Sequence, residues 1–170
     1  HKHSITQFLI AKKFQIPTIL VIRPPEEAVI SFLIREPCIS IDKAFKYWIF
    51  MHKTLWKHKS DFIIGDFEEI TTDFSQVIRR INHRFNTNFN IFEHNKSNVD
   101  KCFESMENYS RKRNQHQINE SSIPRPSTKR QEIRTQLKQR LNNTKFYDLK
   151  QYANEIYHHY LAEINKTENH

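Results

Sequence analysis

The sequence predicts an α/β fold built on a parallel sheet, because two short apolar runs are separated and flanked by helical patterns. Residues 18–22 are almost entirely apolar and β-branched, which is typical of a strand covered on both faces. Residues 61–67, with the sequence DFIIGDF, are predicted to form a second short strand. Strand, helices, strand and helix in this order indicate parallel strands joined by right-handed crossovers.

The first strand is expected between two helices. Residues 5–15 place apolar side chains at helical spacing, and the dipeptide Ile16-Pro17 ends that helix. The strand at 18–22 follows, and we interpret it as a central strand of the sheet. Pro24-Pro25 stops it, and a helix should then run to about residue 35, because proline suits a first helical turn.

A long helix and a second strand–helix pair follow. Residues 41–59 carry apolar side chains every three or four positions, the pattern of a core-packing helix. After the strand at 61–67, Thr72 or Asp73 caps a helix whose apolar stripe ends at Phe85. These elements complete the alternation expected of a parallel sheet.

The remainder of the chain is predicted to be helical with one break. Residues 115–126 are polar and contain Pro124 and Pro126, so they form a loop. We therefore divide the chain into a partial α/β core at 1–114, this proline-containing loop, and C-terminal helices at 127–170 that pack on the same domain.

Composition narrows the possible partners. Of 170 residues, 27 are Lys or Arg and 19 are Asp or Glu, so the net charge of +8 favours nucleic acid, acidic lipid or a phosphorylated small molecule. No apolar run reaches the roughly 18 residues of a membrane span. The two cysteines fit no metal-ligand spacing and favour a reducing compartment, so we expect a cytoplasmic protein without a metal site.

The glycine content excludes one class of nucleotide site. A Gly-rich phosphate loop needs several residues that can adopt positive φ, and Gly65 is the only glycine in the sequence. Any such loop must therefore lie outside these 170 residues.

The strongest candidate for a binding residue is Arg23, directly after the first strand. Open α/β sheets bind ligands at the carboxyl ends of their strands, and the arginine fork suits phosphate. Ser31, eight residues later, could add a hydroxyl donor to the same anion. The spacing equally permits a structural role, in which Arg23 pairs with Glu26, Glu27 or Glu36 and Ser31 only packs.

Three segments, taken in order, resemble the sulfotransferase family. VIRPPEEAVISF, at 21–32, is similar to its 3′-phosphate-binding segment, an apolar strand followed by Arg and, eight positions later, Ser. GDFEEITTDF, at 65–74, resembles the family's strand and Tyr-Glu-Asp-Leu-like turn, with Phe67 in place of Tyr. IPRPSTKRQEIR, at 123–134, and the closing helix resemble the C-terminal region of bacterial sulfotransferase-like proteins.

The resemblance implies a three-layer, parallel-sheet P-loop-type fold, incomplete at its N-terminus, with a helical C-terminal region. It further implies transfer of a sulfuryl group from 3′-phosphoadenosine 5′-phosphosulfate to a hydroxyl or amine, with Arg23 and Ser31 holding the 3′-phosphate. His3, twenty residues before Arg23, corresponds to the family's general base. Arg111 and Lys112 lie in the region of a second 3′-phosphate contact, although a solvated basic helix end is the alternative interpretation.

The sequence also departs from the family. The loop that holds the 5′-phosphosulfate, which carries Gly, Ser or Thr, and Lys, is absent. Because sulfuryl transfer, like phosphoryl transfer, depends on donors placed around the leaving phosphate, we expect that this chain is not fully active alone. It is expected to be the C-terminal part of a longer enzyme or a degenerate relative, and its acceptor is open.

Two other functions compete with this interpretation. The charge and the basic stretch from 111 to 140 are compatible with a noncatalytic nucleic-acid-binding module. That stretch lacks interleaved aromatic residues, which makes nucleic acid a less favoured partner. A helical interaction partner that uses the tyrosine face of the last helix is the third possibility.

Overall fold

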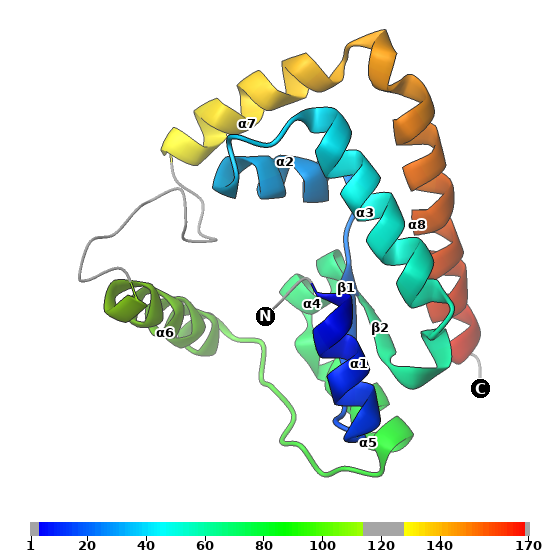
Figure 1. Ribbon diagram of the computed structural model, residues 1–170. Coiled ribbons are helices and arrows are strands. Elements are labelled where there is room, and N and C mark those ends of the chain that lie inside the picture. Colours follow the sequence, from blue (N-terminus) through cyan, green and yellow to red (C-terminus); the bar gives the residue numbers. More distant parts are fainter. Residues whose placement is uncertain (1–3, 114–127, 169–170) are drawn as a thin grey trace.

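The computed structural model describes residues 4–113 and 128–168 (Figure 1). His3 and the predicted loop at 115–126 lie outside the described residues. The described part is mostly helical and contains a small parallel sheet, so the predicted α/β class with helical content is confirmed.

The elements follow the predicted order, with bounds that shift by a few residues. Two single-turn 3₁₀ helices, Lys59–Asp61 and Thr144–Phe146, connect longer elements. The helices and strands are α1 (Ile5–Lys13), β1 (Ile19–Ile22), α2 (Pro25–Arg35), α3 (Ile41–Trp56), β2 (Ile63–Asp66), α4 (Phe67–Thr72), α5 (Phe74–Phe85), α6 (Lys96–Arg113), α7 (Thr128–Leu141) and α8 (Tyr147–Glu168). Helix α4 was not predicted, and it takes Phe67 out of the expected second strand.

The two strands pair in parallel, as predicted. Ile19 of β1 faces Ile63 of β2 and the register continues to Ile22 opposite Asp66, so both strands end at the same edge. In the described residues the sheet has these two strands and not the multi-stranded sheet of a complete P-loop fold.

One face of β1 is more open than expected. Ile22 is completely buried, but Val21 is 42% exposed, so the prediction of a strand covered on both faces is wrong for the face that carries Val21. The cross-strand neighbour of Val21 is Gly65, which has no side chain to cover it. A Cβ at Gly65 would lie 2.8 Å from the Ile70 Cδ1 atom, so α4 packs where that side chain would be.

The core is formed mainly by α3 and α8, which run side by side in Figure 1. Phe45 of α3 and Tyr160 of α8 are both 0% exposed. The Tyr160 hydroxyl donates a 2.8 Å hydrogen bond to the backbone oxygen of His52, and its ring meets that of Trp56 edge to face. Burial of large aromatic side chains therefore joins the C-terminal helix to the first half of the chain.

Helix α7 packs on α2 at one end of the molecule (Figure 1). Its apolar side is narrow, with Leu137 and Leu141 buried and Ile133 partly buried against the core. The rest of α7 is polar and strongly basic. The contact with α2 brings these basic residues to the carboxyl end of β1.

Candidate functional site

Arg23 occupies the carboxyl end of β1, immediately after the buried Ile22. Pro24 follows as the N-cap of α2 and Pro25 is its first residue, so the chain passes from strand to helix within two residues. The guanidinium of Arg23 lies over the ring of Phe67, with 4.3 Å between its Cζ atom and the ring centroid. Pairing of β1 with β2 thus brings together the segments 21–32 and 65–74.

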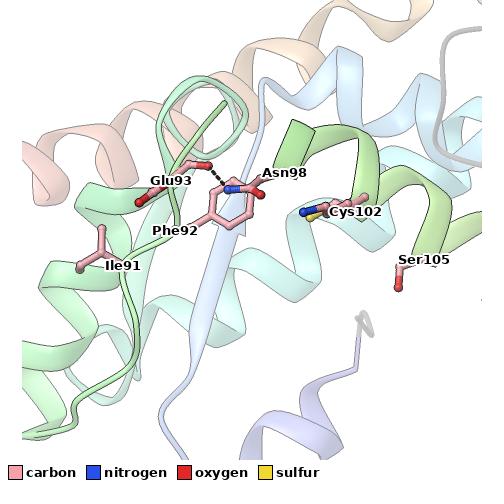
Figure 2. A pocket seen from close by; sticks show the side chains of 7 residues that line it. Ile91, Phe92, Glu93, Asn98, Cys102 and Ser105 are labelled. Carbon is pink, nitrogen blue, oxygen red and sulfur yellow. Dashed lines mark hydrogen bonds between the residues drawn. The ribbon is translucent and has the colours of Figure 1, made fainter. Parts of the chain in front are cut away.

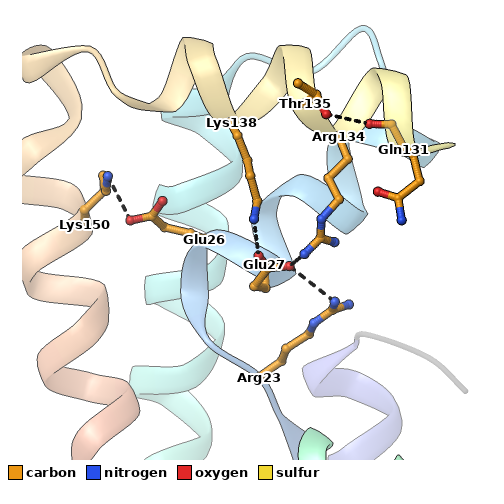
Figure 3. A network of polar contacts seen from close by, with 8 residues as sticks. All are labelled: Arg23, Glu26, Glu27, Gln131, Arg134, Thr135, Lys138 and Lys150. Atoms are coloured by element: carbon orange, nitrogen blue, oxygen red, sulfur yellow. Dashed lines mark hydrogen bonds and ion pairs between the residues drawn. The ribbon is translucent and has the colours of Figure 1, made fainter. Parts of the chain in front are cut away.

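The Glu27 carboxylate lies at the centre of a basic cluster (Figure 3). Its Oε2 atom accepts a 3.4 Å hydrogen bond from the Arg23 guanidinium and a second bond from Arg134. Its Oε1 atom lies 3.3 Å from the ammonium of Lys138. We call these four residues the Glu27 cluster; three cations in it share one carboxylate.

The spacing of basic residues on α7 explains how that helix reaches the site. Arg130, Arg134 and Lys138 are four positions apart, so they lie on one side of the helix. Arg134 follows Ile133, and Lys138 follows the buried Leu137. Because the apolar side of α7 packs against the core, its basic side lies over α2.

The positive charges in this region exceed the negative ones. Burial lowers the pKa of Arg23; the charge of Glu27 opposes this, while Arg134 and Arg130 lower the pKa further. Burial also lowers the pKa of Arg130, followed by the charges of Arg35 and Arg134. Burial is the main cause of both shifts, and the charges of neighbouring arginines add a smaller part, so partly buried cations lie close together in this region.

Arg23 therefore forms the ion pair that the sequence permitted as its structural role, and its partner is Glu27. Ser31 is half-buried on α2, one helical turn beyond Glu27 and on the same side of that helix. Its backbone oxygen accepts a 3.4 Å bond from Arg35. The hydroxyl of Ser31 makes no hydrogen bond with the Glu27 cluster among the described residues, so its predicted role as a phosphate donor stays a prediction.

Two of the remaining predicted residues, Arg111 and Lys112, lie on α6 and not beside Arg23. Arg111 and Lys112 are exposed near the end of α6, and within the described residues neither forms an ion pair or hydrogen bond with Arg23 or Ser31. His3 lies outside the described part of the chain. The structure thus places Arg23 and Ser31 on one continuous segment and leaves the other three predictions untested.

Sequence reasoning missed Arg134 and Lys138. The signal was the four-residue repeat of basic side chains at 130, 134 and 138, which marks one face of a helix. Nothing in that repeat reveals which distant carboxylate it meets. Glu27 was considered, but only as a partner of Arg23.

The neighbouring acids at the same edge are also paired. The carboxylate of Glu26 lies 2.8 Å from the ammonium of Lys150 on α8 (Figure 3). Asp66, the last residue of β2, accepts a 3.1 Å hydrogen bond from the hydroxyl of Tyr157. Asp66 also accepts a bond from the backbone N–H of Glu68, which caps α4. These acids fix the helices around the edge.

The Asp66–Tyr157 bond gives a prediction about stability at high pH. Burial, followed by the charge of Asp66 and the hydrogen bond to it, raises the pKa of Tyr157 to about 12. A pKa raised on folding contributes stability that is present below the unfolded pKa of about 10 and is lost as pH rises through 12. In urea unfolding at pH 7, Tyr157→Phe should cost about 1 kcal/mol, the net worth of one hydrogen bond.

Between pH 10 and 12 the difference in unfolding free energy between wild type and Tyr157→Phe should shrink, because only the wild type loses this contribution. Tyr109→Phe is the control, since Tyr109 is 69% exposed. A difference that stays constant from pH 8 to 11.5 would show that the bond is not formed in solution.

A separate shallow cavity of about 510 Å³ lies beside α6 (Figure 2). Asn98 donates a 3.0 Å hydrogen bond to the backbone oxygen of Glu93 at its wall. The cavity is lined by Ile91, Phe92, Glu93, Asn98, Lys101, Cys102 and Ser105. It contains one basic side chain and no member of the Glu27 cluster, so it is a poorer place for an anion.

Comparison with known proteins adds no relative: no family model, no curated protein and no solved structure matches the chain. In residues 4–113 and 128–168, no group of three or more His, Cys, Asp or Glu side chains is placed to hold a metal ion. No helix in the same described ranges is long and apolar enough to cross a membrane. The Glu27 cluster therefore defines the candidate site by its own geometry.

Proposed function

We propose that the chain binds a phosphorylated nucleotide as a sulfotransferase-like protein, with 3′-phosphoadenosine 5′-phosphosulfate as the donor. Arg23 and Ser31 hold its 3′-phosphate. In the complete reaction a sulfuryl group passes to a hydroxyl or amine acceptor. This chain supplies the 3′-phosphate half of the donor site, because its sequence holds no loop for the 5′-phosphosulfate.

One observation carries the proposal: three cations converge on a single carboxylate at the carboxyl end of a parallel strand. The three positive charges of Arg23, Arg134 and Lys138 less the charge of Glu27 leave +2 (3 − 1). A terminal phosphate carries a charge of about −1.5 to −2 near neutral pH, which balances that excess.

The backbone supports the same conclusion. Pro24 and Pro25 have no N–H group, so Glu26 and Glu27 carry the first two N–H groups of α2, and these have no acceptor within the helix. They lie beside Arg23 at the positive end of the helix dipole. Together with the Arg23 fork they provide donors suited to phosphate oxygens.

The order of the segments favours a sulfuryl donor over other nucleotides. The family's 3′-phosphate segment has an apolar strand, Arg, a Pro or Asn, an acidic residue and then Ser eight positions after the Arg. Residues 19–31 contain these features in the same order, with Arg23 and Ser31 at the two fixed positions. Phe67, at the position of the usual tyrosine, lies against Arg23.

Calorimetric titration with adenosine 3′,5′-bisphosphate tests the proposal, with adenosine 5′-monophosphate as the ligand that lacks only the 3′-phosphate. Charge-assisted hydrogen bonds contribute about 1.5–3 kcal/mol, so the bisphosphate should bind about 10- to 100-fold more tightly. No binding of the bisphosphate, or equal binding of the two nucleotides, would overturn the proposal.

An oligonucleotide titration at two salt concentrations separates the competing nucleic-acid function. Nucleic-acid binding by several phosphate contacts weakens steeply as salt rises. If a 12-mer bound with such a dependence and the bisphosphate did not bind, the chain would be a basic nucleic-acid-binding module. The arrangement of α7 argues against this outcome, because Arg134 and Lys138 point to Glu27 (Figure 3).

A further inference from the structure

Glu27 differs from its neighbour Glu26 in the number of cations around it. The Glu26 carboxylate has one partner, Lys150. The Glu27 carboxylate meets Arg23 and Arg134 through one oxygen and Lys138 through the other (Figure 3). It is thus placed like a bound anion, because carboxylate and phosphate oxygens offer equivalent acceptors to guanidinium and ammonium donors.

The charge of Glu27 is too small for this position. It neutralises one of three cations, and Arg130 adds a further positive charge that lowers the pKa of Arg23. A terminal phosphate with up to two negative charges and three acceptor oxygens would match the same donors better. The cluster is therefore better suited to a phosphate than to the carboxylate it holds.

Solvent can reach every member of the cluster. The side chains of Glu27, Arg23, Arg134 and Lys138 are 24%, 25%, 31% and 53% exposed. The flexible side chain of Glu27 starts from the first turn of α2, so it can turn outward while the helix stays in place. Exchange of its carboxylate for an incoming anion requires no rearrangement of the fold.

We infer that Glu27 is a resident anion, which the ligand phosphate replaces, and that Arg134 and Lys138 of α7 form the second half of the phosphate site. This inference rests on the proposed function for the identity of the nucleotide. The incoming phosphate then takes over the bonds from Arg23, Arg134 and Lys138. It bridges α2 and α7 in place of Glu27.

The first test is Glu27→Gln, which keeps the size of the side chain and removes its charge. Because the resident anion no longer competes, this variant should bind adenosine 3′,5′-bisphosphate about 5- to 10-fold more tightly than wild type. Glu26→Gln is the matched control, with the same change of charge one residue away, and should stay within about twofold. Unchanged or weaker binding by Glu27→Gln would overturn the exchange.

The second test is Arg134→Gln, which removes one cation contributed by α7. Binding of the bisphosphate should weaken about 10-fold or more, whereas Arg140→Gln, on the same helix but outside the cluster, should leave it within about twofold. Wild-type affinity in Arg134→Gln would overturn the role of α7. If Glu27→Gln fails to fold, as judged by circular dichroism, Arg134→Gln alone decides the inference.

Inorganic pyrophosphate, which has no base or sugar, separates failure of this inference from failure of the proposed function. If the wild type binds pyrophosphate but not the bisphosphate, and Glu27→Gln binds pyrophosphate more tightly, the exchange stands and the nucleotide assignment fails. If the bisphosphate binds through Arg23 but is indifferent to Glu27 and Arg134, the function stands and the exchange fails. Absence of binding by both ligands overturns both.

Discussion

Arg23→Ala is expected to reduce the affinity for adenosine 3′,5′-bisphosphate by about 30- to 100-fold, from the loss of charge-assisted bonds worth about 2–3 kcal/mol. Arg23 is half-buried between Phe67 and Glu27, so it is held in place before a ligand arrives. The fold should tolerate the change, because Glu27 keeps Arg134 and Lys138 as partners. Calorimetry on the wild type and the variant measures the effect.

Two further variants make the result specific. Arg23→Lys keeps the charge but replaces the planar fork with a single ammonium, so its affinity should fall between those of wild type and Arg23→Ala. Arg79→Ala removes an exposed cation from α5 and should bind like the wild type. Equal affinities for wild type and Arg23→Ala would show that the phosphate binds elsewhere.

Tyr160→Ala is expected to destabilise the chain by about 3–5 kcal/mol, as large-to-small changes of buried aromatic residues do. Tyr160 is 0% exposed, and its ring meets both His52 and Trp56 edge to face. The substitution would leave a cavity between α3 and α8 and remove the hydrogen bond to the His52 backbone oxygen. Urea unfolding followed by circular dichroism measures the change in free energy.

Tyr160→Phe separates the two contributions. It keeps the ring and leaves one buried carbonyl without this donor, which should cost about 1–3 kcal/mol. Tyr152→Ala is the control on the same helix, because Tyr152 is 40% exposed, and should cost about 1 kcal/mol or less. If Tyr160→Ala cost no more than this control, α8 would not be docked on α3 as described.

Local sequence patterns predicted the strand-to-helix unit that carries Arg23. The β-branched run, two prolines and two acids act over a few residues, and β1 and α2 form where these signals lie. The parallel pairing with β2 was also predictable, since helices separate the two strands. The position of Arg23 at the strand end follows from these local rules.

The features that could not be predicted depend on distant contacts. The exposure of Val21 depends on its pairing with Gly65, and the choice of Glu27 as the centre of the cluster depends on where α7 docks. Helix α4 was missed because its six residues follow the strand directly, capped by Asp66. The contact between the ring of Phe67, its first residue, and the guanidinium of Arg23 could therefore not be predicted.

The bond between Glu27 and Arg134 joins residues 107 positions apart in the sequence, whereas Glu27 and Arg23 are only four apart. Closing so long a loop costs conformational entropy, so contacts between residues far apart in the sequence form later in folding than local ones. A chain in which α7 has not yet docked can pair Arg23 with Glu27 but cannot complete the cluster. The full set of cations around Glu27 is therefore assembled only after α7 has docked on α2.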